Sequence, residues 1–231
     1  MYCSNILNLP CFENRGRSYF RMMSKREQFT LSLSKYVPEQ GLMQVVGLIF
    51  EHRVRFKITK SRKTKLGDYR FDSRDNSEQI SVNGNLNPYS FYFTTIHEFA
   101  HLVAFQTYGR RIAAHGEEWK HTFTMLLLKG DVMHWFPMEI RPLLKKYMEN
   151  PKASTASDHG LYMALRKYDT QLSSEKNTVY LHELPRGQVF VVNDRKFILG
   201  EKRRTRYLCK EWQSGREFLV SGLAEVEIQE H

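Results

Sequence analysis

Four of the nine histidines in the 231-residue chain lie within residues 94–123, and two of them bracket a glutamate. His97 and His101 are four residues apart, so a helix would place both imidazoles on one face, one turn apart. Two imidazoles in that arrangement can bind one Zn²⁺. Glu98 would lie on the neighbouring flank, close to the metal without facing it, where a carboxylate can act as a general base for water. This stretch predicts a zinc site with a catalytic carboxylate.

A catalytic zinc needs a third protein ligand and one open coordination position. Gly109 is expected to end the helix, so that the chain can reverse and bring His115 to the start of the next helix. We predict His115 as the third ligand. Glu117 and Glu118 remain alternatives, because some enzymes with the same histidine spacing take a glutamate from a later helix. His121 lies deeper in that helix and is expected to be structural.

The spacing of apolar residues predicts a helical framework around this site. The helix with the two histidines should begin at Pro88, in its first turn, and run to about Tyr108. Further helices are expected over residues 25–51, divided at Pro38, and over residues 115–129 and 137–148.

Two strands are expected before the metal helix. Residues 52–59 alternate basic and apolar side chains, which is the pattern of a half-buried strand. Its basic positions should share one face: Arg53, Arg55 and Lys57. Residues 79–86 form a second strand candidate that ends in an Asn-Gly turn, and residues 79–83 are expected to be the edge to which an extended substrate adds. The polar, basic stretch between the two strands is expected to be a loop or hairpin.

The pattern changes in the last third of the chain. Residues 149–178 are expected to be a linker, and residues 179–231 a small all-β module of about five strands separated by turn residues. Residues 25–148 would then form one α+β domain, preceded by an extension over residues 1–24 that could be disordered.

Composition limits the class of protein. No apolar run approaches the roughly 18 residues of a membrane span, and the first twenty residues lack the apolar core of a secretory signal. Cys3, Cys11 and Cys209 form no CxxC pair, which argues against a disulfide scaffold and favours the cytoplasm. The net charge of +10 favours nucleic acid as a partner. We expect a cytoplasmic monomer without a membrane partner.

The segment HEFAHLVAFQTYGRRIAAHGEEWK, residues 97–120, resembles the SprT-like family, which includes the Spartan-type proteases. That family combines HExxH, a short loop and a third histidine in an H-G-x-x-[WF] context, and the resemblance extends over residues 25–148. It implies a zincin-like metallopeptidase domain with zinc on His97, His101 and His115, and with Glu98 as the catalytic base. It also implies protein substrates that are bound or crosslinked to DNA.

One feature departs from the family pattern. Many SprT-like proteins carry a C-terminal zinc ribbon with paired CxxC elements, whereas Cys209 stands alone here. A single cysteine cannot complete a four-thiolate site. The module over residues 179–231 is therefore expected to be ribbon-like but metal-free, held together by aromatic and aliphatic side chains.

Two basic clusters are candidate contacts for DNA without sequence preference. The first is the face of Arg53, Arg55 and Lys57 described above. The second is a predicted turn with four basic residues: Lys202, Arg203, Arg204 and Arg206. The aromatic residues Trp212, Tyr207 and Phe218 could stack on single-stranded bases if they were exposed, but a small β module needs them in its core, where we expect them.

These observations favour a zinc metalloendopeptidase that works near DNA. An alternative is a nucleic-acid-binding protein whose zinc site is structural or vestigial, although such a site has no need of the base Glu98. A further alternative is a metal-independent scaffold that binds a protein partner through its β module.

Overall fold

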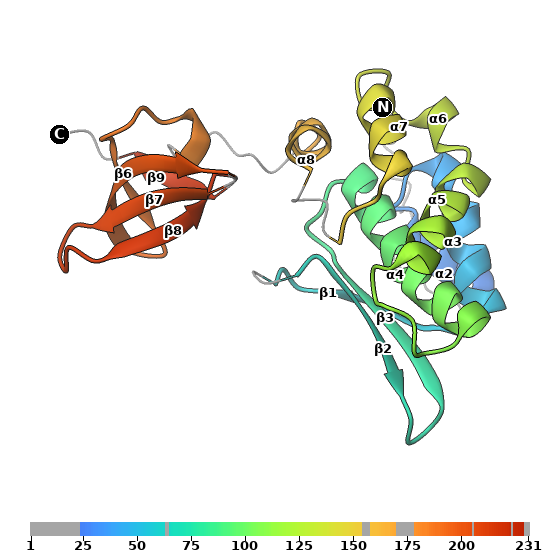
Figure 1. Ribbon diagram of the computed structural model, residues 1–231. Helices are drawn as coiled ribbons and strands as arrows, with labels where there is room; N and C mark the ends of the chain where they lie inside the picture. The colour runs from blue at the N-terminus through green and yellow to red at the C-terminus, as the bar shows by residue number, and fades with distance from the viewer. Residues whose placement is uncertain are drawn as a thin grey trace, which may run out of the picture. The chain divides into compact units, whose positions relative to one another are not determined.

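The computed structural model describes residues 24–62, 65–153, 158–169, 178–204, 206–222 and 224–228. The chain divides into two compact units: residues 1–153 with 164–168, and residues 154–163 with 169–231. The first contains helices and a three-stranded sheet, and the second contains an antiparallel sheet (Figure 1). The mixed α+β class is confirmed. The predicted N-terminal extension lies almost wholly outside the described residues.

Helices make up most of the first unit. Their bounds are Lys25–Leu33 for α2, Glu39–Glu51 for α3, Pro88–Tyr108 for α4, Glu117–Lys129 for α5, Val132–Trp135 for α6 and Arg141–Glu149 for α7. The predicted helices are confirmed, with α2 and α3 divided by a segment that ends at Pro38. The short helix α6 is an addition to the predicted set, and α7 begins at Arg141, four residues later than expected.

The three-stranded sheet corrects one prediction. Its strands are β1 (Arg55–Thr59), β2 (Gly67–Asp72) and β3 (Ser77–Asn83), in the order β1-β3-β2. Strand β3 pairs with β1 in parallel and with β2 in antiparallel register, so the strand expected to be an edge is central. The strand at the edge beside β3 is β2, which forms a hairpin with β3; a hairpin was one of the two alternatives expected for this stretch. Its residues alternate, with Gly67, Tyr69 and Phe71 between charged residues, but the strand is only six residues long and follows a polar, basic segment.

Helix α4 carries the histidines, and its ends are set by local sequence. The Asn87 side chain accepts a hydrogen bond from the backbone N–H of Ser90, and Pro88 occupies the first turn. At the other end Gly109 has a φ of +88°, which glycine adopts without steric cost. Most of the helix is buried, and it contacts α3, α5, β2 and β3. The site is therefore built on a rigid central element.

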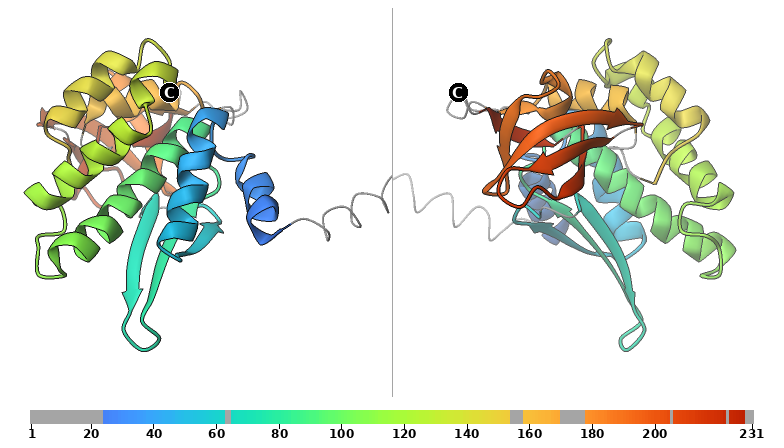
Figure 2. Two further views of the ribbon diagram at one scale, coloured as in Figure 1. Left: turned by 90° about the vertical axis from the view of Figure 1, so that its right-hand side faces the viewer. Right: turned by 60° about the vertical axis from the view of Figure 1, so that its left-hand side comes forward.

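Aromatic packing fixes α5 against α4. The ring of Phe93 on α4 lies edge-on to Phe123 of α5, with centroids 5.3 Å apart, and to Tyr147 of α7 at 5.5 Å. All three side chains are almost fully buried. Burial of such rings is among the largest apolar contributions to folding. Figure 2 shows the β2–β3 hairpin extending away from these helices.

The second unit is built around a six-stranded sheet with the order β4-β9-β5-β6-β7-β8, in which each printed pairing is antiparallel. The bounds are Thr178–Tyr180 for β4, Val189–Val192 for β5, Arg195–Arg203 for β6, Arg206–Glu211 for β7, Glu217–Ser221 for β8 and Glu225–Ile228 for β9, with a 3₁₀ turn, η2, over Leu181–Glu183. About five strands were expected, and the described residues form six.

The core of the second unit is apolar and contains the thiol of Cys209. Its fully buried members are Leu181, Phe190, Phe197, Leu199, Cys209 and Val226. Burial raises the pKa of the Cys209 thiol, which disfavours the thiolate that a metal would need. That the module is metal-free stays a prediction.

The segment expected to be a linker, residues 149–178, contains helix α8 (His159–Arg166). Its buried residues Leu161, Ala164 and Leu165 have helical spacing, a signal that the polar residues before and after them obscure. No helix among the described residues has the length and apolar character needed to cross a membrane.

Candidate metal centre

Three histidine side chains converge between α4 and α5. The Nε2 atom of His97 lies 3.3 Å from Nε2 of His101 and 3.4 Å from Nε2 of His115. The potential ligand atoms of the three residues all lie within 4.8 Å of one another, and among the described residues no other group of this kind is found. His97 and His101 are one turn apart on α4, and His115 precedes α5 after the chain reverses at Gly109.

The spacing of these nitrogens fits a tetrahedral metal ion. Zinc binds imidazole nitrogen at about 2.0–2.1 Å, so two nitrogens at a tetrahedral angle would be about 3.3 Å apart. The distances of 3.3 and 3.4 Å from His97 match that value. The single Nε2 position of His97 can form a hydrogen bond with only one of its two neighbours, His101 or His115. A metal ion bound by all three nitrogens would account for both short distances.

The electrostatic environment keeps the imidazoles neutral. Burial lowers the pKa of His97 to about 3, and the neighbouring charges of His101 and His115 act in the same direction. Burial likewise lowers the pKa of His101 to about 4, and it lowers that of His115. Neutral imidazole is the form that binds a metal, so no proton has to be displaced near neutral pH.

Contacts around the histidines hold their rings in place. The ring of His101 is hydrogen-bonded to the backbone of Ala114 in the loop before α5, an interaction that raises its pKa. A hydrogen bond at the second ring nitrogen fixes the tautomer of a ligating histidine. The buried indole of Trp119 packs on all three rings, with centroids 4.7 Å from His97 and His115 and 5.3 Å from His101.

The indole N–H of Trp119 is buried and has no hydrogen-bond acceptor among the described residues. An unpaired buried donor of this kind costs about 1–3 kcal/mol. Trp119 follows His115 by four residues and lies in the first turn of α5. The H-G-x-x-[WF] element that contains His115 therefore also supplies the aromatic ring that packs against the three histidines.

Glu98 is buried at the interface of α4 with strand β2. Its side chain is 7% exposed, and burial raises the pKa of its carboxyl to about 8, with the negative charge of Asp68 adding to the rise. The backbone N–H of Tyr69 donates a hydrogen bond to the carboxylate and opposes this shift. A divalent cation beside Glu98 would also favour its charged form.

The close approach of β2 to Glu98 depends on Gly67. A Cβ atom at Gly67 would lie 2.5 Å from Oε1 and 2.8 Å from Cγ of Glu98, and 2.7 Å from Cγ2 of Thr94. Real Cβ contacts are essentially never this short, so another residue would displace the strand or the carboxylate. The Gly67 position therefore helps to place the candidate base.

A polar clamp ties β2 to the end of α4. The hydroxyl of Tyr69 donates to Glu78 at 2.8 Å, and Arg110 donates to both the Tyr69 hydroxyl and Glu78. The guanidinium of Arg110 also lies 3.4 Å from the ring centroid of Phe71. The ring of Tyr69 stacks nearly parallel to that of His101, with an angle of 8° between planes. Tyr69 thus contacts a candidate ligand with its ring and the candidate base with its backbone.

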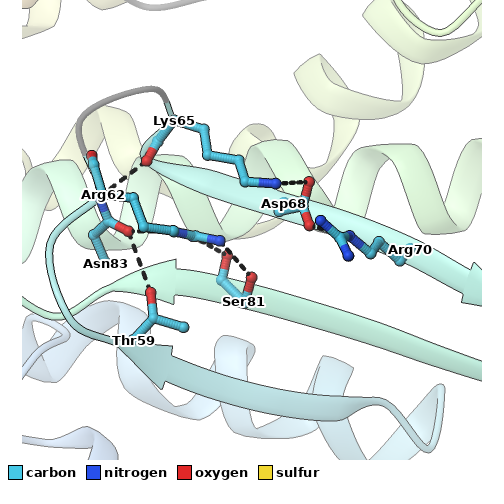
Figure 3. A network of polar contacts seen from close by, with 7 residues as sticks. All are labelled: Thr59, Arg62, Lys65, Asp68, Arg70, Ser81 and Asn83. Atoms are coloured by element: carbon cyan, nitrogen blue, oxygen red, sulfur yellow. Dashed lines mark hydrogen bonds and ion pairs between the residues drawn. The ribbon is translucent and has the colours of Figure 1, made fainter.

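A second network anchors the loop before β2 to the sheet (Figure 3). Arg62 donates to the side chains of Asn83 and Ser81, and the Asn83 amide donates to the backbone carbonyls of Arg62 and Lys65. Asn83 and Ser81 are both buried. Arg62 therefore has a structural role in the sheet and is not a free cation for a partner.

Strand β2 begins with an ion-pair group next to Glu98. The carboxylate of Asp68 accepts from Lys65 at 2.7 Å and from Arg70 (Figure 3). Burial raises the pKa of Asp68, but these two cations outweigh it, and the pKa is lowered overall. Asp68 raises the pKa of Glu98, whereas Arg62 and Lys65 lower it. The pKa of Glu98 therefore depends on charges of both signs in β2 and in the loop before it.

The alternative third ligands lie elsewhere. The side chain of Glu117 is 87% exposed and pairs with Lys120, and neither Glu117 nor Glu118 belongs to the metal-binding group. His121 is exposed on α5. The geometry thus favours His115, as predicted. No sequence pattern singled out Gly67 or Tyr69, because their contacts with Glu98 join segments that are distant in the chain.

The predicted nucleic-acid contacts are at the surface. Arg53 has a φ of +50° and precedes β1, so only Arg55 and Lys57 share the strand face that was expected to carry all three. Arg55 forms an ion pair with Asp75 at 2.7 Å. The second cluster is exposed around the β6–β7 hairpin: Lys202, Arg203, Arg204 and Arg206. Contact with nucleic acid stays a prediction for both.

One of the three aromatic residues expected in the β core is outside it. Tyr207 and Phe218 pack against the core of the second unit. Trp212 is 53% exposed, in contrast to the prediction. It follows the last residue of β7, at a position where the alternation of the strand directs the side chain away from the core.

Comparison with known proteins supports these observations. The model of the SprT-like family matches residues 39–130. Protein SprT of Pseudomonas fluorescens (strain SBW25) is 31% identical over 165 residues, which cover 67% of this chain and 80% of that protein. No solved structure gives a significant match.

Proposed function

The chain belongs to the SprT-like family, and we propose that it is a zinc-dependent metalloendopeptidase with a zincin-like fold in residues 25–148. The observation that carries the proposal is the convergence of three imidazole nitrogens beside a buried carboxylate. His97, His101 and His115 would hold the metal. Glu98 would be the general base.

The donor set suits zinc. Three neutral imidazoles with space for a fourth ligand are characteristic of catalytic zinc sites, whereas structural sites use four protein ligands. Bound zinc would lower the pKa of a water molecule and polarise a peptide carbonyl. Glu98 would accept a proton and deliver it to the leaving amine. The N–H of Tyr69 would hold the carboxylate in place for both transfers.

The substrate is proposed to bind along β2. This strand pairs with β3 on one side only, and the Tyr69 N–H on its other side reaches Glu98. An extended protein segment could add to that edge as a further strand, so that backbone hydrogen bonds position it without demanding a particular sequence. Strand β2 therefore takes the role of substrate-binding edge that the sequence analysis assigned to residues 79–83.

DNA is proposed as the partner that brings substrates to the site. The net charge of +10 and the exposed basic residues of β1 and the β6–β7 hairpin support non-specific contact with phosphates. The proposed substrates are proteins bound or crosslinked to DNA. A monomeric, cytoplasmic protein remains the expectation from sequence.

A nucleic-acid-binding protein with a structural metal site is the second candidate. The exposed basic residues are as compatible with this second candidate as with the peptidase. A buried carboxyl with a raised pKa costs stability, however, and a structural site gains nothing from it. Glu98 therefore favours the enzyme.

The test is proteolysis of a DNA-binding protein substrate, with and without single-stranded DNA, at low and high salt. We expect cleavage that DNA stimulates at low salt and that salt suppresses, because counterion release weakens phosphate contacts. Equal cleavage in all four conditions would leave a zinc peptidase without DNA coupling. No cleavage by zinc-loaded protein in any condition would favour the second candidate.

A further inference from the structure

Strand β8 forms one edge of the six-stranded sheet in the second unit (Figure 1). Among the described residues it pairs with β7 alone, and the register of that pairing is regular along its whole length. An edge strand presents a row of backbone N–H and C=O groups that no neighbouring strand uses, and such a row is a template for a further strand. Strand β8 therefore offers a place for another strand to pair.

The hydrogen bonds to β7 identify which backbone groups of β8 face outward. The carbonyl of Arg216, the residue before β8, accepts a hydrogen bond from the backbone N–H of Glu211 at 2.8 Å, so it points towards β7. In an antiparallel pair the backbone groups of successive residues alternate between the two sides of a strand. The groups of Glu217, Leu219 and Ser221 therefore point away from β7, to the free edge.

Strand β8 lacks the features that usually protect a sheet edge, which are charged side chains, proline, a bulge or a very short strand. The other edge of the same sheet, β4, has only three residues. In the first unit the edge strand β1 has charged residues at alternate positions, Arg55 and Lys57. By contrast, the five residues of β8 include no proline and a single charged side chain, Glu217 at the start. This edge is open to pairing.

Apolar side chains lie on both faces of β8. Phe218 and Val220 pack against the core of the second unit but are only partly buried. Leu219 points to the opposite face and is 52% exposed. Exposed apolar groups beside an unpaired edge are typical of a surface that binds another chain. A strand with apolar residues at the matching positions would cover all three side chains.

We propose that β8 pairs with β8 of a second copy of this chain, in antiparallel register about a two-fold axis at Leu219. Leu219 would then lie opposite Leu219 of the second copy. Phe218 would lie opposite Val220 on the core face, and Glu217 opposite Ser221. Directly opposed residues share a face, so apolar side chains meet on both faces and no like charges are opposed.

The other two-fold registers of this edge are less favourable. An axis at Glu217 would place two carboxylates directly opposite each other, which destabilises a strand pair. An axis at Ser221 would leave the first residues of β8 without a partner strand. The register centred on Leu219 is the one that pairs all five residues.

The contact is small, and the chain is charged. Five residues of strand span about 17 Å, so the interface falls below the roughly 1,000 Å² of a stable complex. The net charge of +10 makes two copies repel each other, and salt screens that repulsion. We therefore expect a weak, reversible dimer that strengthens as salt rises, in contrast to the monomer expected from sequence. This inference is independent of the metal site and does not rest on the proposed function.

The experiment is sedimentation velocity of the full chain, free of nucleic acid and with a reductant present, at low and high salt. Protein concentrations from about 1 µM to about 1 mM cover the dissociation constants of weak complexes. Leu219→Lys places two ammonium groups opposite each other and should weaken association on the order of tenfold. Leu219→Glu should do the same with two carboxylates. An equal mixture of the two variants should associate more tightly than either alone, because opposite charges then meet across the axis.

A matched control separates this edge from a general effect of charge. Met138→Lys adds the same charge at a side chain that is 78% exposed in the first unit, and it should associate like wild type. Gain of association in the mixture also shows that both Leu219 variants are folded. A wild-type chain that stays monomeric over the whole concentration range, wild-type association in Leu219→Lys, no gain in the mixture, or a dimer that salt weakens would each overturn the proposal.

Discussion

Gly67→Ala should slow proteolysis without removing the metal. The added methyl group would lie 2.5 Å from Oε1 of Glu98 and 2.7 Å from Cγ2 of Thr94, so either β2 or the carboxylate must move. Overpacking of this kind costs about 1–3 kcal/mol of folding free energy. A displacement of about 1 Å at a catalytic group can reduce the rate on the order of 100-fold. The atoms nearest to the added methyl group belong to Glu98 and Thr94 rather than to the three histidines, and zinc content should stay at the wild-type level.

The assay combines three measurements on one preparation: turnover of a protein substrate, zinc by elemental analysis and thermal unfolding. Gly47→Ala is the matched control. Gly47 lies within α3, and a Cβ atom there would meet nothing within 4 Å. Alanine inside a helix is favoured over glycine by roughly 0.5–1 kcal/mol, so this control should melt at or slightly above the wild-type temperature and retain full turnover.

The inference that the close approach of β2 positions Glu98 would be refuted if Gly67→Ala kept wild-type turnover and melting temperature. Loss of zinc from Gly67→Ala would also contradict the reasoning, because it would show that the position of β2 affects the histidine ligands more than the base. A loss of turnover in Gly47→Ala would indicate a general sensitivity to substitution and remove the contrast on which the test depends.

Two further variants test the ligand set and the clamp. His115→Ala should lower zinc affinity strongly, whereas Glu117→Ala should not. Zinc affinity is measured by competition with a chromogenic chelator. Full zinc retention in His115→Ala would remove His115 from the ligand set. Tyr69→Phe removes the hydrogen bonds that the hydroxyl makes with Glu78 and Arg110, which should lower the free energy of unfolding by about 0.5–1.5 kcal/mol in a denaturant titration, because Glu78 and Arg110 keep their ion pair with each other. Unchanged stability would show that the clamp contributes nothing to the fold.

The helix that carries the histidines could be predicted because its signals are local. An asparagine cap and Pro88 start it, Gly109 stops it, and two histidines one turn apart need only helical geometry to share a face. His115 was preferred over the glutamates because a chain reversal at Gly109 would bring it to the start of the next helix. In the structure His115 joins the other two histidines because of the path of the loop before α5, which places the centroid of its ring 4.6 Å from that of His101.

The parts that sequence missed depend on contacts between distant segments. Strand β2 was expected only as part of a possible hairpin, because it is short and lies between polar, charged segments. Its role as the edge beside Glu98 follows from the order of strands in the sheet. Tyr69 acts on Glu98 through a backbone N–H, for which no side-chain pattern exists. Trp212 was assigned to the core because aromatic residues in small β modules are usually buried, whereas the strand alternation directs it outward.

The central claim is that Glu98 is the base of a zinc peptidase. Its most direct test is a comparison of wild type with Glu98→Gln, in which zinc content and the rate of cleavage of one protein substrate are measured on the same samples. Glutamine keeps the size of the side chain but cannot accept the proton. The account predicts equal zinc and a loss of cleavage by several orders of magnitude in Glu98→Gln. Cleavage at the wild-type rate with zinc bound would contradict it.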